Sequence, residues 1–256
     1  MKPSEKRTSK GLWWDRAWSL VDGCTPVSEG CAHCWSASMA RRFGRDFSAV
    51  TPRWDRLELP LKVRRPTVWA VWNDLFHEQV STSFIDAALE MMMNCPQHLF
   101  LVLTKRAHLI GQKLYGVTKD RPLRALGGGD YVPNLWLGVT AENQRHADER
   151  IPLLLRIPAA KRFVSVEPML GRVDLTRWLA CRRVTTPAGW KRNGDRNPLD
   201  LVIVGAETGP GKRPMDLQWA RDLWKQCQNA DVPFWFKQGP GGEKTLDGKV
   251  VREWPE

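Results

Sequence analysis

The 256-residue sequence predicts an α/β fold in which buried parallel strands alternate with helices. Short apolar runs rich in β-branched and aromatic residues recur roughly every thirty residues, which is the period of a βα unit. Segments with apolar residues at helical spacing separate several of these runs. Polar or charged side chains follow each run directly. Because the carboxyl ends of parallel strands open on one face, this pattern is typical of a barrel or a doubly wound sheet.

Six continuous apolar runs are expected to form buried parallel strands. They are Thr67–Val71, Leu99–Leu103, Leu135–Val139, Arg162–Val166, Leu201–Val204 and Pro233–Phe236. Three helices are expected, namely Phe84–Met93 with Ser81 and Ser83 as candidate caps, Ala147–Leu155, and Leu217–Ala230 capped by Asp216. Two polar stretches, Thr118–Asn134 and Thr185–Asn197, are expected to be loops.

The chain is expected to form one domain over residues 1–256, with an N-terminal arm over 1–12 and a tail over 239–256. The sequence contains no run of about 18 apolar residues, so a transmembrane helix is not expected. Residues 1–10 are charged and polar, and no apolar segment follows them, so a secretory signal is not expected. These features predict a cytoplasmic protein without a membrane partner.

The net charge of +11 predicts an affinity for polyanions. Basic residues crowd the stretch from Arg41 to Arg65, and Arg41, Arg42 and Arg45 directly follow a group of cysteines. These three arginines are therefore candidates for gripping nucleic-acid phosphates. A solvated basic surface without a partner would have the same composition.

Three of the six cysteines, Cys24, Cys31 and Cys34, lie within eleven residues in a C-x6-C-x2-C pattern. This spacing in a long chain favours a metal or redox site over disulfides. A structural zinc site needs a fourth ligand. The sequence has no second CxxC pair, and His33 is a poor fourth ligand because it lies between two of the cysteines. Cys95, Cys181 and Cys227 lie singly and are interpreted as buried apolar residues.

Three thiolates without a fourth ligand also suit a [4Fe–4S] cluster that leaves one iron open. Radical S-adenosylmethionine (SAM) enzymes use such an iron to bind SAM, and their usual spacing is C-x3-C-x2-C. The first gap here is three residues longer. Zinc and a cluster therefore both remain open at this point.

Beyond the cysteines, the sequence resembles the phage Gp37/Gp68 family. The matching stretches run in family order from about Trp13 to Gly239. They are Gly23–Trp35, Asn73–His77, Leu103–Arg106, Leu137–Asn143, Ser165–Pro168, Val202–Pro210 and Phe236–Gln238. Trp35 stands where the family usually has tyrosine, and Ala206 and Thr208 stand where glycine and serine are usual.

The resemblance implies a partial (β/α)6 barrel of radical SAM type with its cluster loop near the N-terminus. It implies that Cys24, Cys31 and Cys34 ligate a [4Fe–4S] cluster that binds SAM and is reduced by an electron donor. Polar residues after the strands would then line the SAM and substrate cavity. The candidates are Asn73, Asp74, Lys105, Glu142, Glu167 and Glu207. Arg106 and Lys237 are further candidates, and a structural ion pair or helix cap is the alternative for each.

The expected substrate is a modified base in DNA, because the chain is basic and the similar family is phage-borne. The expected reaction is an isomerisation or rearrangement of a thymidine substituent, which would serve restriction evasion in a bacterial host. A partner protein encoded nearby is a further expectation. The alternatives are a radical SAM enzyme acting on RNA, a peptide or a small metabolite; a zinc-stabilised, non-enzymatic nucleic-acid-binding protein; and an Fe–S sensor.

Overall fold

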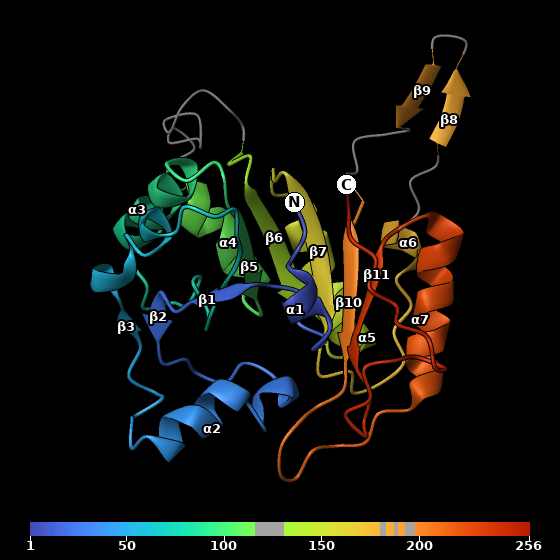
Figure 1. Cartoon of the computed structure of the whole chain (residues 1–256), viewed down its shortest axis with the longest axis horizontal. Helices are drawn as coiled ribbons and strands as arrows, with labels where there is room; N and C mark the ends of the chain where they lie inside the picture. The colour runs from blue at the N-terminus through green and yellow to red at the C-terminus, as the bar shows by residue number, and fades with distance from the viewer. Residues whose placement is uncertain (116–130, 180–182, 187–188, 193–197) are drawn as a thin grey trace.

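The computed structural model describes the backbone of residues 1–115, 131–179, 183–186, 189–192 and 198–256. Seven parallel strands form one sheet in the order β1-β4-β5-β6-β7-β10-β11. They are β1 Arg16–Trp18, β4 Val68–Val71, β5 Leu99–Thr104, β6 Leu135–Thr140, β7 Lys161–Val166, β10 Leu201–Gly205 and β11 Phe234–Gln238. The strands follow chain order across a sheet that curls into a half-barrel (Figure 1). The α/β class is confirmed, and the half-barrel is compatible with a partial barrel.

The six expected strands are present, and β1 is an additional strand at the sheet edge. It pairs in parallel with β4, with Ala17 opposite Ala70. Because β1 spans only three residues, it is too short to show a periodic pattern in the sequence. The half-barrel therefore has seven strands where the sequence predicted six.

The three expected helices are also present, with two of them starting earlier than predicted. They are α3 Thr82–Met93, α5 Gln144–Leu154 and α7 Leu217–Ala230. Ser81 caps α3 by accepting a hydrogen bond from the Phe84 amide, and Asp216 caps α7 in the same way. The start of α5 is fixed by Asn143, whose side chain accepts from the His146 amide.

Several further elements were not expected. They are α1 Glu5–Thr8, β2 Val21–Asp22, η1 Glu29–Cys31, α2 Trp35–Arg42, β3 Thr51–Pro52, η2 Trp54–Arg56, η3 Pro60–Lys62, α4 Ala107–Tyr115 and α6 Thr176–Leu179. Strands β8 Arg183–Thr186 and β9 Gly189–Arg192 pair antiparallel and overlap the second predicted loop, so that prediction was wrong for the residues it shares with them. Most of the first predicted loop, residues 118–130, and Cys181 lie outside the described residues.

The convex face of the half-barrel packs against helices α3, α4, α5, α6 and α7 and forms the main core. Alternate residues of each strand point to this side, for example Phe100 and Val102 of β5 and Val202 and Val204 of β10. Strands covered on both faces need apolar residues at every position, which explains their continuous apolar runs.

The concave face is filled by aromatic side chains. Trp13, Trp136, Phe163 and Trp235 form the large members of a second buried cluster. Gly138 makes room for Phe163, because a Cβ at this glycine would lie 2.4 Å from the Phe163 Cζ atom. The concave side is therefore a packed core at this level and not an open channel.

The two ends of the chain meet beside this aromatic cluster. Trp254 stacks on Trp136 with ring centroids 5.1 Å apart, and its indole N–H donates to the Met1 carbonyl oxygen at 2.7 Å. The tail hydrogen-bonds along β11, where the Phe236 amide donates to the Val251 carbonyl at 2.9 Å. Figure 1 shows both termini at the end of the half-barrel opposite α2. Within the described residues, every helix is too short or too polar to span a bilayer.

Candidate functional site

The three clustered cysteines lie on one loop, residues 24–34, which we call the cysteine loop. It leaves β2, contains η1 and ends at the start of α2. All three thiols are free and partly exposed. In Figure 1, α2 lies at the same end of the molecule at which the chain leaves β10, which is the carboxyl end of the sheet.

Contacts at the end of β5 hold the first part of the loop. Arg106, which is 1% exposed, donates to the Thr25 carbonyl at 3.0 Å and to the Thr25 hydroxyl at 2.7 Å. The same guanidinium donates to the Cys24 Sγ atom at 3.6 Å. It also pairs with buried Asp74 at 3.1 Å and with Glu78 at 2.7 Å. Arg106 therefore connects the cysteine loop to the ends of β4 and β5.

Contacts at the end of β6 hold the middle of the loop. Ser28 donates to the Glu142 carboxylate at 2.5 Å, and Glu29 accepts from the Asn143 amide at 2.6 Å. Gly30 packs directly on Glu142, since a Cβ at this glycine would lie 2.2 Å from the Glu142 Oε1 atom. Any larger residue at position 30 would push the loop away from β6.

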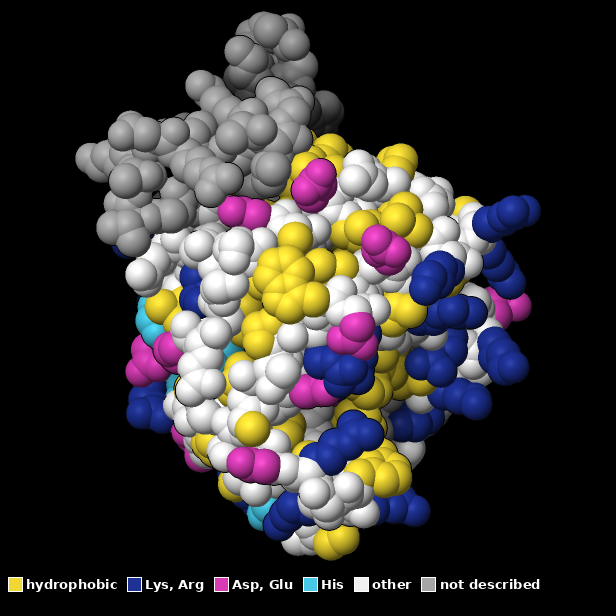
Figure 2. Space-filling model, turned by 90° about the vertical axis from the view of Figure 1, so that its left-hand side faces the viewer, with side chains coloured by type: hydrophobic (Ala, Val, Ile, Leu, Met, Phe, Trp, Pro, Cys, Tyr) yellow, Lys and Arg dark blue, Asp and Glu magenta, His cyan; other side chains and the backbone are white. Residues whose placement is uncertain are grey.

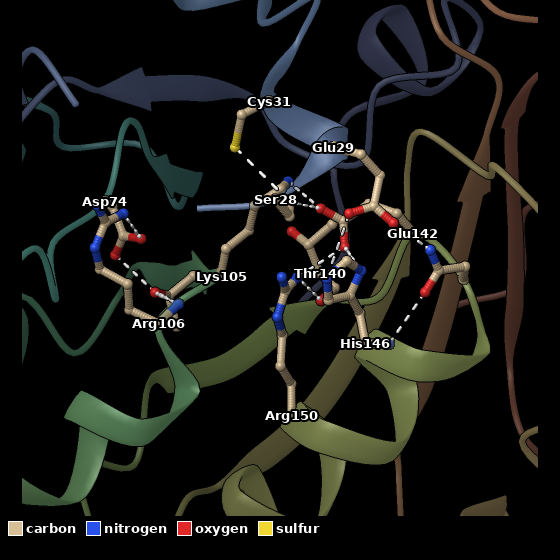
Figure 3. A network of polar contacts seen from close by, with 12 residues as sticks. Ser28, Glu29, Cys31, Asp74, Lys105, Arg106, Thr140, Glu142, His146 and Arg150 are labelled. Atoms are coloured by element: carbon tan, nitrogen blue, oxygen red, sulfur yellow. Dashed lines mark hydrogen bonds and ion pairs between the residues drawn. The ribbon is translucent and has the colours of Figure 1, made fainter. Parts of the chain in front are cut away.

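Glu142 is the centre of this contact and is fully buried. Arg150 donates to it at 2.7 Å, and the Lys105 ammonium lies 3.4 Å from its Oε1 atom. Figure 3 shows the Ser28, Lys105 and Arg150 side chains directed toward the Glu142 carboxylate. Burial alone would raise the pKa of Glu142, but the two cations and the Ser28 hydrogen bond outweigh it and lower the pKa to about 2. Glu142 is thus ionised, and side chains of the protein occupy its carboxylate oxygens.

A contact at the end of β10 holds the last part of the loop. The His33 Nδ1 atom lies 2.8 Å from the Glu207 carboxylate. Arg213 donates to the same carboxylate from its backbone amide at 2.8 Å and from its guanidinium at 2.6 Å. The Arg213 hydrogen bonds, with that from His33, outweigh burial and lower the pKa of Glu207 to about 2. His33 therefore serves as a contact to the sheet in this structure.

Three charged residues at the same end remain more accessible. Glu167 follows β7 and pairs with Lys237 near the end of β11. Their side chains are 21% and 24% exposed, and Lys105 is 19% exposed. By contrast, Asp74 is buried and accepts from the Thr104 hydroxyl at 2.7 Å as well as from Arg106. Glu167, Lys237 and Lys105 are thus the post-strand charges that a ligand reaches most easily.

The predicted post-strand residues do gather at one end of the half-barrel, but most of them contact protein. Asn73 adopts a left-handed backbone with φ 58°, and its side-chain amide donates to the Val21 carbonyl at 2.6 Å. Asp74, Glu142 and Glu207 each hold a cation or the cysteine loop. Their roles in binding SAM stay predictions, whereas the structure shows that they hold basic side chains and the cysteine loop in place.

Some residues of the site had no signal in the sequence. Ser28 and Arg150 meet at Glu142, although Ser28 lies 114 residues before that glutamate. Arg213 lies in a polar stretch of the sequence, where no pattern indicates its contact with Glu207. Ser28 gave no signal because a hydroxyl in a loop looks like an ordinary turn residue.

The residues fit a [4Fe–4S] cluster in number and chemistry. The loop supplies three free thiols, and Arg106 provides an N–H···S contact of the kind that accompanies cluster ligation. Burial and the Asp74 carboxylate raise the pKa of Cys24 to about 11, against the lowering effect of Arg106. Among the described residues, no group of three or more His, Cys, Asp or Glu side chains is placed to hold a single metal ion. Ligation by these cysteines stays a prediction.

The nucleic-acid candidates lie beside this site. Arg41, Arg42 and Arg45 are exposed at the end of α2 and just after it. Two other arginines of the basic stretch are already paired, since Arg53 and Arg56 donate to Asp22 at 2.6 and 3.0 Å. The basic stretch is therefore only partly available to a ligand. Cys95 and Cys227, in contrast, are buried as expected.

The sequence profile of DUF5131, described as a protein of unknown function, matches residues 8–252. The chain belongs to the DUF5131 family. The cysteine loop and all seven strands lie within the matched residues. No curated protein and no solved structure matches the chain. Because the DUF5131 description names no activity, radical SAM chemistry and the resemblance to the phage Gp37/Gp68 family stay predictions.

Proposed function

We propose that the chain is a radical SAM enzyme whose Cys24, Cys31 and Cys34 hold a [4Fe–4S] cluster. The observation that carries this proposal is the position of the cysteine loop. Contacts from Thr25, Ser28 and His33 fix it across the carboxyl ends of β5, β6 and β10. Active sites of parallel barrels are built at this end.

Bound by these cysteines together with SAM, such a cluster would supply radical chemistry at an unactivated carbon when an electron donor reduces it. The protein's own contribution is to place the thiols and to exclude water. Arg106 holds Cys24, and the aromatic cluster on the concave face closes the half-barrel below the site. Glu167, Lys237 and Lys105 are positioned to bind the charged groups of SAM or substrate.

The proposed substrate is a modified base in DNA, and the proposed reaction is an isomerisation or rearrangement of its substituent. The net charge of +11 and the exposed arginines next to the cysteine loop support a polyanionic substrate. Comparing the modified nucleosides in DNA made with and without the gene tests this part. Identical nucleoside profiles would point to RNA, a peptide or a small metabolite.

Anaerobic purification and reconstitution test the cofactor. We expect about four irons per chain, with release of 5′-deoxyadenosine from SAM under a strong reductant. Substituting Cys24, Cys31 or Cys34 by Ala is expected to abolish both. Cys95→Ala is the matched control, because Cys95 is buried away from the loop. Stoichiometric zinc with intact SAM would replace the proposal with a zinc-stabilised nucleic-acid-binding protein, and a cluster that leaves SAM intact would indicate a sensor.

A further inference from the structure

A pocket of about 420 Å³ lies beside the cysteine loop, under α2. Trp35 and Met39 of α2 and Phe43, the residue directly after it, line the pocket at intervals of four, so they lie on one face of the helix and its C-terminal end. Trp35 and Phe43 are 50% and 61% exposed, which is high for large apolar side chains. Trp72, at the end of β4, lines the same pocket and meets the Trp35 ring edge-on with centroids 4.7 Å apart.

A second pocket adjoins the first, since Trp72 lines both. Its other lining residues include Arg7, Arg16 and Lys62, with Trp69 between them. The Arg16 guanidinium lies over the Trp69 ring at 5.9 Å from its centroid. Exposed cations, Arg16 and Lys62, therefore lie near the partly exposed Trp72 at the edge formed by β1, whereas Trp69 itself is buried.

The acidic residues in these pockets are already occupied by protein donors. Asp22 binds Arg53 and Arg56, and Asp15 accepts from the Ser4 hydroxyl at 2.6 Å and from the Val68 amide at 3.0 Å. Asp46 lines the first pocket as well and accepts from the Ser48 hydroxyl at 2.7 Å. Asp15 and Asp46 have only neutral donors and keep their charge, but basic side chains outnumber the three aspartates that line the two pockets; they are Arg7, Arg16, Arg45, Arg56 and Lys62. Further exposed cations lie on α2, just after it and around η3. Figure 2, which shows the left-hand side of the view in Figure 1, has Lys and Arg side chains gathered toward its right-hand side, with hydrophobic side chains between them.

We infer that the two pockets that share Trp72 form a binding surface for single-stranded DNA. Aromatic side chains that stack on bases, set in a positively charged groove, are the general means of holding single strands. The pocket under α2 would take a base beside the cysteine loop, and the pocket at β1 would take its neighbour. This inference rests on the proposed function, which it deepens by specifying how the DNA strand reaches the site. A duplex would first have to release the base.

The test uses the reconstituted full-length protein and a fluorescently labelled single-stranded DNA oligonucleotide, with binding measured by anisotropy at several salt concentrations. Arg45→Glu combined with Lys62→Glu changes one exposed cation in each pocket. Because each lost phosphate contact lowers the salt slope by about 0.7 for single strands, we expect the slope to fall by about 1.4. Lys225→Glu is the matched control. It makes the same charge reversal as each of the two substitutions, at an exposed position on α7, and its affinity should match that of the unaltered protein.

Trp35→Ala tests the stacking contribution separately. Half of this side chain is exposed, so its loss should leave the fold intact, which circular dichroism checks. We expect affinity to fall at least about fivefold with an unchanged salt slope, because stacking on one base contributes at least that factor.

Unchanged affinity and slope in both sets of variants would overturn the inference, as would tighter binding of duplex DNA or of single-stranded RNA. The outcome is separable from that of the proposed function. Oligonucleotide binding that depends on these residues without SAM cleavage would refute the radical SAM proposal and leave the surface standing. SAM cleavage without such binding would support the radical SAM proposal and refute the binding surface.

Discussion

Replacing Glu142 by Gln removes one negative charge from the most buried part of the site while keeping the shape of the side chain. Arg150, 6% exposed, would lose its ionised partner, and Lys105 would lose a charge at 3.4 Å. The hydrogen bond from Ser28 would weaken as well, because its acceptor would become neutral. We therefore expect Glu142→Gln to destabilise both the fold and the attachment of the cysteine loop.

The size of the effect follows from the pKa of Glu142, which is lowered from 4.5 to about 2. Because the folded state holds the ionised form more tightly, the stabilisation is complete above the unfolded pKa and is lost as pH falls toward the folded pKa. The lowering corresponds to about 3 kcal/mol of unfolding free energy at pH 7. By pH 3 only about 1.5 kcal/mol of it should remain.

Urea denaturation of the original protein and of Glu142→Gln at pH 7 and pH 3 measures this difference. Glu149→Gln is the control, since Glu149 is exposed on α5, the helix that also carries Arg150. We expect it to change stability by less than about 0.5 kcal/mol. A difference for Glu142→Gln below about 1 kcal/mol at pH 7, or one that does not shrink at pH 3, would refute this account of the network.

Three further substitutions probe the same architecture. Arg106→Met leaves Asp74 buried without its cation and should cost about 3–5 kcal/mol in urea denaturation; if the cost does not fall when Asp74→Asn is added, the two residues are not coupled. Gly30→Ala should lower iron retention after reconstitution, because the new Cβ would collide with Glu142, and full retention would contradict the close packing. Asp216→Ala removes the cap of α7 and should cost about 1 kcal/mol, whereas no change would show that other contacts satisfy the helix end.

The strands and capped helices could be predicted because their signals are local. The runs over β5 and β10 are apolar at almost every position, as strands covered on both faces must be. Helix α2 was missed because it spans only eight residues and buries none of them, so its apolar repeat is too short to predict a core-facing helix. Strand β1 was missed because its pairing with β4 depends on residues far along the chain.

The site was only partly predictable for a related reason. The order of polar residues after each strand indicated that they would meet, since parallel strands share one carboxyl edge. What each residue does there depends on its partner across the fold. Glu142 was expected to face a ligand, yet Arg150, Lys105 and Ser28 occupy it. Periodicity and spacing in one sequence carry no information on such pairings.

The stacked pair of Trp136 and Trp254 has an optical consequence. Two indoles with centroids 5.1 Å apart and planes inclined by 25° form a rigid chiral arrangement. Such fixed aromatic packing produces near-ultraviolet circular dichroism, which disappears when tertiary packing is lost even if secondary structure remains. Because one partner lies near the end of the tail, this signal reports whether the tail is docked on the half-barrel. The protein therefore carries an intrinsic spectroscopic probe at the end of the half-barrel opposite the cysteine loop.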